Sequence, residues 1–137
     1  MHQRGLVIRL ALLGLCALVA CRDFVRPIDG PLATATILGR VASPNGIGVA
    51  GVSVVVEARS QSSCANSRMD RDSVLTDANG EYRATVMNWG LEYTVCGRVR
   101  VRPASSFAAD SVDRTPVRMH HLSPDTVRVD IVLQPSA

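Results

Sequence analysis

Lysine is absent from this 137-residue sequence, so all fifteen of its basic residues are arginine. This absence excludes a Schiff-base lysine, a phosphate-binding P-loop lysine and the lysine–asparagine cross-link of some surface adhesin domains. The hydrolase motifs G-x-S-x-G and H-E-x-x-H are missing too. We therefore expect a domain that is not an enzyme and that carries no cofactor or metal ion.

The one long apolar run lies at the N-terminus, from Leu6 to Ala20, and it is interrupted by Arg9. Eleven residues follow that arginine, which is too short for a bilayer-spanning helix but typical of the apolar region of a signal peptide. We expect residues 1–20 to form a signal helix that is removed on export. A retained membrane anchor is the less favoured alternative.

The apolar run ends in Leu18-Val19-Ala20-Cys21. This tetrapeptide resembles the bacterial lipobox, and the resemblance implies cleavage before Cys21 and a diacylglycerol on its thiol. The alternative is an ordinary secretory signal in which Cys21 is incidental. Arg22 stands where an aspartate would retain a lipoprotein at the inner membrane, so the resemblance implies a lipid-anchored envelope protein, delivered to the outer membrane.

Residues 21–33 contain two prolines and a glycine and lack periodicity, which indicates an extended tether before a domain at residues 34–137. The formal charge of +3 includes two arginines in the segment expected to be removed, which leaves +1 for the remainder. So small a charge indicates no nucleic-acid partner.

From Thr34 onward, apolar residues recur at every second position, which is the pattern of β-strands. The pattern predicts an all-β, two-sheet Greek-key sandwich of about seven strands, with polar loops at residues 60–71 and 103–124 and at most a short strand near Val117. The Asp77-Ala78-Asn79-Gly80 turn should join two strands, with Asn79 and Gly80 in left-handed conformations. The predicted strands cover residues 34–42, 52–58, 73–76, 82–87, 91–102 and 126–133.

Several of these segments resemble the carboxypeptidase regulatory-like domain, which has a transthyretin-like sandwich. The matching segments are Ile37-x-Gly39-x-Val41, Gly51-Val52-x-Val54-x-Val56, Thr76-Asp77-x-Asn79-Gly80-x-Tyr82, Tyr93-x-Val95 and Val129-x-Ile131-x-Leu133-Gln134-Pro135. The resemblance implies a non-catalytic structural or protein-interaction module. Transthyretin-like hydrolases share that fold, but their C-terminal Tyr-Arg-Gly-Ser is absent here.

Cys64 and Cys96 are the other two cysteines of the exported part. In an oxidising compartment such a pair favours a disulfide over two free thiols. The resemblance implies that the strands beside these cysteines are neighbours, which places the two thiols within reach of each other.

Arg98, Arg100 and Arg102 form an arginine stripe on one face of a predicted strand, and the single tryptophan, Trp89, stands at a turn. These four residues are the candidate binding residues for an envelope protein or a glycan. The alternatives are ion pairs with acids such as Glu57 for the stripe and packing at the edge of the core for Trp89.

Three further motifs are explained by turn and strand structure. The glycine-rich run at residues 46–51 matches G-x-G-x-x-G, but a strand follows it where a dinucleotide site needs a helix. Asp70, Asp72, Asp77 and Asn79 are turn-type residues whose spacing does not fit an EF-hand calcium loop. His120 and His121 are adjacent, so on a strand their side chains point to opposite faces.

The sequence therefore predicts a non-enzymatic envelope lipoprotein whose sandwich serves as a structural or protein-interaction module. A carbohydrate-binding module that uses Trp89 and the arginine stripe is the alternative function.

Overall fold

A computed structural model describes residues 30–60, 64–65, 67–103 and 106–136 of the chain. The predicted signal helix, Cys21 and most of the tether lie outside these residues. The described part is all-β and contains no helix, as predicted. Its strands are β1 (Leu32–Ala42), β2 (Ser53–Ser60), β3 (Arg68–Leu75), β4 (Glu81–Trp89), β5 (Glu92–Arg102), β6 (Asp110–His120), β7 (Thr126–Arg128) and β8 (Ile131–Val132).

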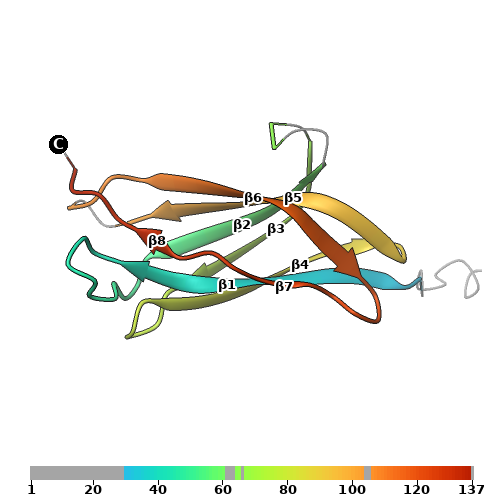
Figure 1. Ribbon diagram of the computed structural model, residues 1–137, viewed down its shortest axis with the longest axis horizontal. Coiled ribbons are helices and arrows are strands. Elements are labelled where there is room, and N and C mark those ends of the chain that lie inside the picture. The colour runs from blue at the N-terminus through green and yellow to red at the C-terminus, as the bar shows by residue number, and fades with distance from the viewer. Residues whose placement is uncertain (1–29, 61–63, 66, 104–105, 137) are drawn as a thin grey trace, which may run out of the picture.

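The strands form one continuous sheet in the order β3-β2-β5-β6-β1-β4, and β7 and β8 pair with β1 (Figure 1). The sheet curls until its two edge strands, β3 and β4, lie beside each other, which makes it nearly closed. The division into two separate sheets stays a prediction, because this hydrogen-bonded order is unbroken. The expected adjacency of the second strand and the long strand is confirmed by the antiparallel pairing of β2 with β5.

The core lies inside this curled sheet and consists of the alternate, inward-facing residues of its strands. In β1 every second residue from Ala33 to Val41 is buried. The largest fully buried side chains are Ile37, Met119, Ile131, Leu133, Val41, Val54, Val56, Val86, Val95, Val99, Val101 and Val117. The period-two apolar pattern of the sequence is therefore the pattern of core burial.

The chain bends between β7 and β8, beside the middle of β1. At the bend the Val129 carbonyl turns inward and accepts a hydrogen bond from the buried Tyr82 hydroxyl at 2.7 Å. Gly39 makes this possible, because a Cβ on that residue would lie 1.8 Å from the Val129 oxygen. The carboxylate of Asp130 accepts the Arg40 N–H at 2.8 Å, which occupies the donor that the bend leaves without a ladder partner.

Three segments differ from the sequence prediction. The single strand predicted at residues 126–133 is divided by the bend into β7 and β8. The predicted loop at residues 103–124 contains the eleven-residue strand β6, and β3 begins at Arg68, inside the other predicted loop. Most of β6 between Asp110 and Pro116 is exposed, so its sequence lacks the apolar alternation that marks a strand. In the Asp77–Gly80 turn only Gly80 is left-handed, with a φ of 79°.

Candidate functional site

Side-chain carboxylates join the two edge strands of the sheet. Asp70 of β3 accepts the N–H of Met87 in β4 at 2.6 Å, and Asp72 accepts the N–H of Thr85 at 2.9 Å. Both aspartates alternate with exposed residues on β3 and face the same side as the core residues of β2. Inward-facing charges of this kind end a sheet without a further backbone ladder.

The series of carboxylates is interrupted at Val74. Continuing the antiparallel spacing of the two aspartate contacts by two residues places Val74 opposite Arg83. The N–H of Arg83 points toward β3, because N–H groups alternate along a strand and those of Thr85 and Glu81 point away from β1. Among the described residues no acceptor is found for it.

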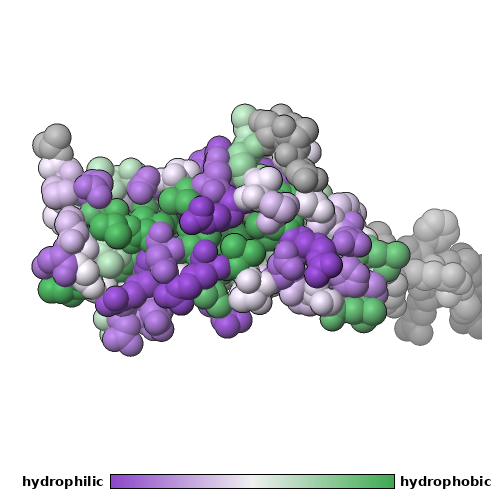
Figure 2. Space-filling view, viewed as in Figure 1, coloured by the Kyte–Doolittle hydropathy of each residue, from purple (hydrophilic) through white to green (hydrophobic). Residues whose placement is uncertain are grey.

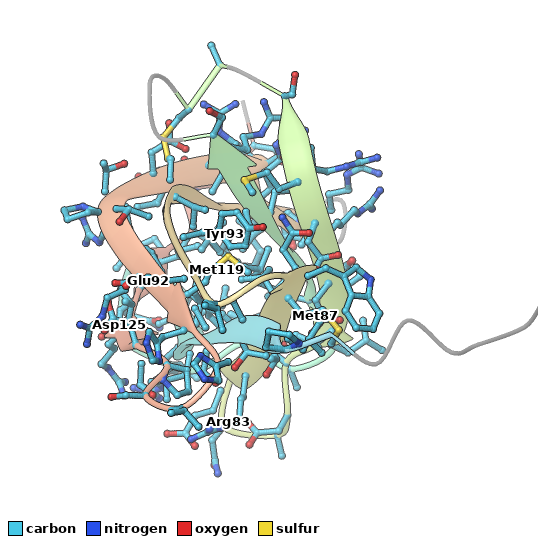
Figure 3. All side chains as sticks on the ribbon, turned by 90° about the vertical axis from the view of Figure 1, so that its right-hand side faces the viewer. Arg83, Met87, Glu92, Tyr93, Met119 and Asp125 are labelled. Carbon is cyan, nitrogen blue, oxygen red and sulfur yellow. A yellow bond between two sulfur atoms is a disulfide. The ribbon has the colours of Figure 1, made fainter. Side chains whose placement is uncertain are left out.

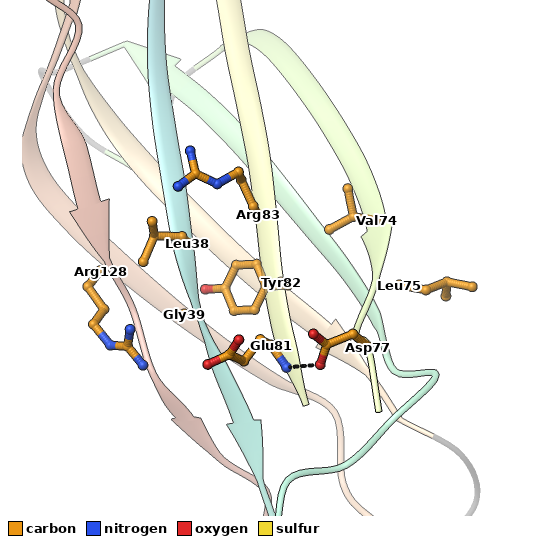
Figure 4. Close-up of a pocket in the computed structure, with 9 residues that line it drawn as sticks. All are labelled: Leu38, Gly39, Val74, Leu75, Asp77, Glu81, Tyr82, Arg83 and Arg128. Carbon is orange, nitrogen blue, oxygen red and sulfur yellow. Dashed lines mark hydrogen bonds between the residues drawn. The ribbon is translucent and has the colours of Figure 1, made fainter. Parts of the chain in front are cut away.

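An open cleft of about 550 Å³ lies at this interruption (Figure 4). It extends across β4, since its walls come from β3 on one side and from β1 and β7 on the other. Below the interruption, Asp77 accepts the N–H of Glu81 at 2.9 Å. The cleft is lined by Leu38, Gly39, Val74, Leu75, Asp77, Glu81, Tyr82, Arg83 and Arg128.

The charges in the cleft are balanced, with two arginines and two acids in its walls. Arg128 is already paired with Asp130 at 2.9 Å, and its hydrogen bond lowers the pKa of that carboxyl group. The Arg83 guanidinium has no ion-pair partner among the described residues. Arg83 therefore offers a backbone donor and a charged side chain to the same cleft.

Both tyrosine hydroxyls donate hydrogen bonds, one in the interior and one at a turn. Burial raises the pKa of Tyr82 well above its ordinary value, and the hydroxyl donates to Val129. The Tyr93 hydroxyl donates to the carbonyl of Trp89. Both hydroxyls thus donate hydrogen bonds to backbone carbonyls.

The structure brings only two of the predicted binding residues together: Arg100 and Arg102 line a shallow cleft of about 340 Å³ beside Asp110. Arg98 makes a bidentate pair with Asp113 at 2.7 and 2.8 Å, and Arg100 lies 3.4 Å from Glu57. Arg102 has no ion-pair partner in the described part of the chain. Trp89 is exposed at one end of the molecule, far along β4 from the cleft.

Glu57 is a nearly buried carboxylate among three arginines: Arg59 at 2.9 Å, Arg100 at 3.4 Å and Arg68 at 3.9 Å. Burial by itself raises the pKa of Glu57, but the hydrogen bond from Arg59 and the arginine charges outweigh it and hold the pKa below its ordinary value of 4.5. The ionised form is therefore favoured by folding.

The position of Glu57 predicts a specific loss of stability in acid. A lowered pKa contributes stability that is complete above pH 4.5 and is lost as the pH falls through the lowered value. Thermal unfolding of Glu57→Gln should show a flatter dependence on pH below 5 than the wild type, because glutamine does not titrate. Parallel curves for the two proteins would contradict this account.

The predicted pairing of Cys64 with Cys96 is present as a disulfide. Cys96 lies on β5 opposite Arg59 of β2, and the Arg59 guanidinium donates to the Cys64 carbonyl at 3.1 Å. The disulfide therefore fixes the loop after β2 onto the sheet. Cys21, the predicted lipidation site, lies outside the described residues.

No set of residues that would hold a metal ion is found in the described ranges. The one group of three candidate ligands is Cys64, Cys96 and Asp113, and the two sulfurs are bonded to each other. The carboxylates at the predicted turn accept backbone N–H groups instead. The rings of His120 and His121 stack with centroids 4.8 Å apart, whereas the sequence predicted opposite faces.

The sequence analysis missed Val74 and Arg83 as site residues. The signal for them was present, because Asp70, Asp72 and Val74 occupy every second position of one short segment. The predicted loop ended at residue 71 and the predicted strand began at residue 73, so the three positions were not recognised as one strand, and the nearness of β3 to β4 was not predicted.

Comparison with known proteins finds similarity in structure: no family model matches the chain, and no curated protein sequence does. The fold is similar to 3-chlorocatechol 1,2-dioxygenase from Rhodococcus opacus, with a TM-score of 0.53 and 10% identity over 80% of this chain and 62% of that one. Chlorocatechol 1,2-dioxygenase from Pseudomonas putida gives a TM-score of 0.52 and 13% identity, over 78% and 62% of the two chains. The chain thus spans less than two thirds of these enzymes.

A third similar structure is the dioxygenase domain of a dioxygenase–carbohydrate-binding fusion protein from a Streptomyces species. Its TM-score is 0.50 with 14% identity, and the match covers 81% of this chain and 86% of that domain. Most of this chain therefore has a fold similar to that of a dioxygenase domain.

These neighbours correct two predictions. We expected a domain that is not an enzyme and that serves as a structural, protein-interaction or carbohydrate-binding module. Both expectations are wrong, because the proteins with a similar fold are enzymes. The predictions rested on missing hydrolase motifs and on the resemblance to a non-catalytic family, and neither of these reports on oxidative chemistry.

Dioxygen chemistry requires a metal ion or an organic cofactor. The described residues do not fit such a metal centre, since their one group of candidate ligands, Cys64, Cys96 and Asp113, has its two sulfurs bonded to each other.

Proposed function

We propose that this domain binds a small aromatic compound with an acceptor oxygen, such as a phenol-type hydroxyl or a carboxylate, in the cleft across β4. The observation that carries the proposal is the Arg83 N–H, which faces Val74 where its neighbours on β4 face carboxylates. A ligand oxygen at this position would accept the Arg83 N–H, as the carboxylates of Asp70 and Asp72 accept the N–H groups of Met87 and Thr85.

The lining supports this class of ligand. Leu38 and Val74 provide apolar surface for a ring, and the Arg83 side chain supplies a second donor. Because the two acids balance the two arginines, the cleft favours a neutral or singly charged molecule over a polyanion. The names of the structural neighbours agree, since they are dioxygenases of catechol or chlorocatechol, which are small aromatic diols.

The binding proposal is tested by following the Arg83 amide in ¹⁵N-labelled protein during titration with catechol or benzoate. The Arg83 amide proton should move downfield more than the amide protons of Thr85 and Met87, because only Arg83 gains a new acceptor. A response to one of the two probes identifies the oxygen group. Cyclohexane-1,2-diol serves as the non-aromatic control, and the absence of any Arg83 response would overturn the proposal.

Val74→Asp should close the site, because the new carboxylate continues the series formed by Asp70 and Asp72. Amide exchange at Arg83 should be faster than at Thr85 in the wild type and should slow on this substitution, while aromatic probes no longer shift the Arg83 signal. Ser73→Asp is the matched control, since it adds the same charge one residue away on the exposed side and Ser73 does not line the cleft. Unchanged exchange at Arg83 in the Val74→Asp variant would contradict the assigned geometry.

The proposal includes the location of the domain. We propose that the chain is exported and anchored to the envelope, at the outer membrane, by acylation of Cys21, which is supported by the lipobox-like tetrapeptide. The disulfide agrees with an oxidising compartment. Metabolic labelling with palmitate should mark the wild type and not Cys21→Ser. No helix in the described residues is long and apolar enough to cross a membrane.

The resemblance to the carboxypeptidase regulatory-like domain, with its two-sheet sandwich, belongs to the proposal as well. It is supported by the roles of Gly39 and Tyr82, which meet the inward-turned Val129 carbonyl and which both lie in the matching segments.

A further inference from the structure

Apolar side chains gather at the end of the molecule where the described chain begins. Trp89 is 57% exposed, Leu91 59% and Leu122 79%. They lie on the β4–β5 turn and the β6–β7 turn, which sit at the right-hand end in Figure 1, beside the entry of the chain. Figure 2 shows hydrophobic surface at this same end. We call these three residues the apolar end.

The two turns are held together and hold the start of the chain. The Leu91 carbonyl accepts the N–H of His121 at 3.1 Å, and Gly90 donates to the Pro31 carbonyl at 2.8 Å. A Cβ on Gly30 would lie 3.6 Å from the Trp89 ring. The apolar end and the first described residue are therefore one contiguous surface.

The charged groups of this region lie behind the turns. Residues 88–91 (Asn-Trp-Gly-Leu) and 121–124 (His-Leu-Ser-Pro) contain no aspartate, glutamate or arginine. Asp125 is held by Arg118, whose N–H it accepts at 2.9 Å, and Glu92 is the first residue of β5 (Figure 3). A tryptophan with neighbouring leucines and no charge at the tip is the composition of a membrane-interface anchor.

The length of chain before Gly30 places a membrane within reach. Cys21 precedes Gly30 by nine residues. At about 3.5 Å per residue these residues reach about 30 Å at most, so an acylated Cys21 keeps this end near the lipid surface. The opposite end of the domain, which carries the exposed Ile47 and Leu75, lies farther away along the strands.

We infer that the apolar end docks on the lipid bilayer when the chain is anchored at Cys21, with Trp89, Leu91 and Leu122 entering the interfacial region. This inference rests on the proposed anchoring. Docking orients the domain with its strands rising from the membrane and leaves the cleft, at the start of β4 and away from Trp89, open to the aqueous side.

The single tryptophan makes the inference directly measurable, since Trp89 is the only one in the chain. Protein spanning residues 21–137 contains the whole core described above and one thiol outside the disulfide, Cys21. That thiol is coupled to a maleimide lipid in phosphatidylcholine vesicles. The tryptophan emission should shift to shorter wavelength on coupling, and brominated phosphatidylcholine should quench it.

The double variant Leu91→Ser/Leu122→Ser should lose most of the quenching, and the matched control Ile47→Ser/Leu75→Ser at the opposite end should keep it. Emission that stays unshifted and unquenched, or quenching that survives in the Leu91→Ser/Leu122→Ser variant, would overturn the inference. Chemical coupling supplies the anchor whether or not cells acylate Cys21, so failure here is distinct from failure of the palmitate labelling.

Discussion

Gly39→Ala should destabilise the domain by about 3 kcal/mol or more, an effect at the upper end of overpacking substitutions. The added Cβ would lie 1.8 Å from the Val129 carbonyl oxygen and 2.6 Å from its carbon, both of them backbone atoms. The bend between β7 and β8 must move outward to make room. That movement withdraws the carbonyl from the Tyr82 hydroxyl, which is then left buried without its acceptor.

Chemical denaturation with urea measures this loss, and Gly30→Ala is the matched control. A Cβ at Gly30 meets only the Trp89 ring, at the ordinary contact distance of 3.6 Å. Neither glycine has a positive φ, so the comparison isolates the steric effect from backbone preference. Equal midpoints for the two variants would show that the Val129 carbonyl is not held against Gly39.

Replacing both disulfide cysteines, Cys64→Ala with Cys96→Ala, should cost about 3–4 kcal/mol in the chain-entropy treatment of a cross-link. The two residues are separated by 32 positions, so the disulfide removes many conformations from the unfolded chain. For a domain of this size the melting temperature should fall by about 15 °C or more.

The wild-type protein in excess reductant is the control for this experiment, because it should melt close to the double variant. Strand content measured by circular dichroism should be unchanged below the transition, since neither cysteine belongs to the apolar core cluster. A double variant that melts with the oxidised wild type would show that the cross-link adds nothing to stability.

The strands that enclose the core were predictable because their burial follows their sequence pattern. In β1 and β5 apolar residues alternate with polar ones, and Val95, Val99 and Val101 are buried as expected. The strand β6 was not predictable, because its outer half is exposed and gives no alternation. Strand prediction from apolar periodicity finds only strands that face a core on one side.

The cleft could not be predicted from the sequence for a different reason. Its defining feature is a relation between β3 and β4, two edges that share no ladder and meet only when the sheet curls. Arg98, Arg100 and Arg102 attracted attention because they are a local pattern, whereas Val74 and Arg83 form a pair only in the folded protein. Long-range register is the information that one-dimensional patterns lack.

The joining of β3 to β4 through Asp70 and Asp72 also bears on self-association. An uncovered sheet edge is a template on which the strand of a foreign chain can assemble, and that is a common route to aggregates. Here the two edge strands lie beside each other, and two carboxylates accept hydrogen bonds from the N–H groups that an incoming strand would need. At Arg83 no carboxylate of the described chain takes the N–H. One such donor cannot support an intermolecular ladder, but it can bind a small molecule.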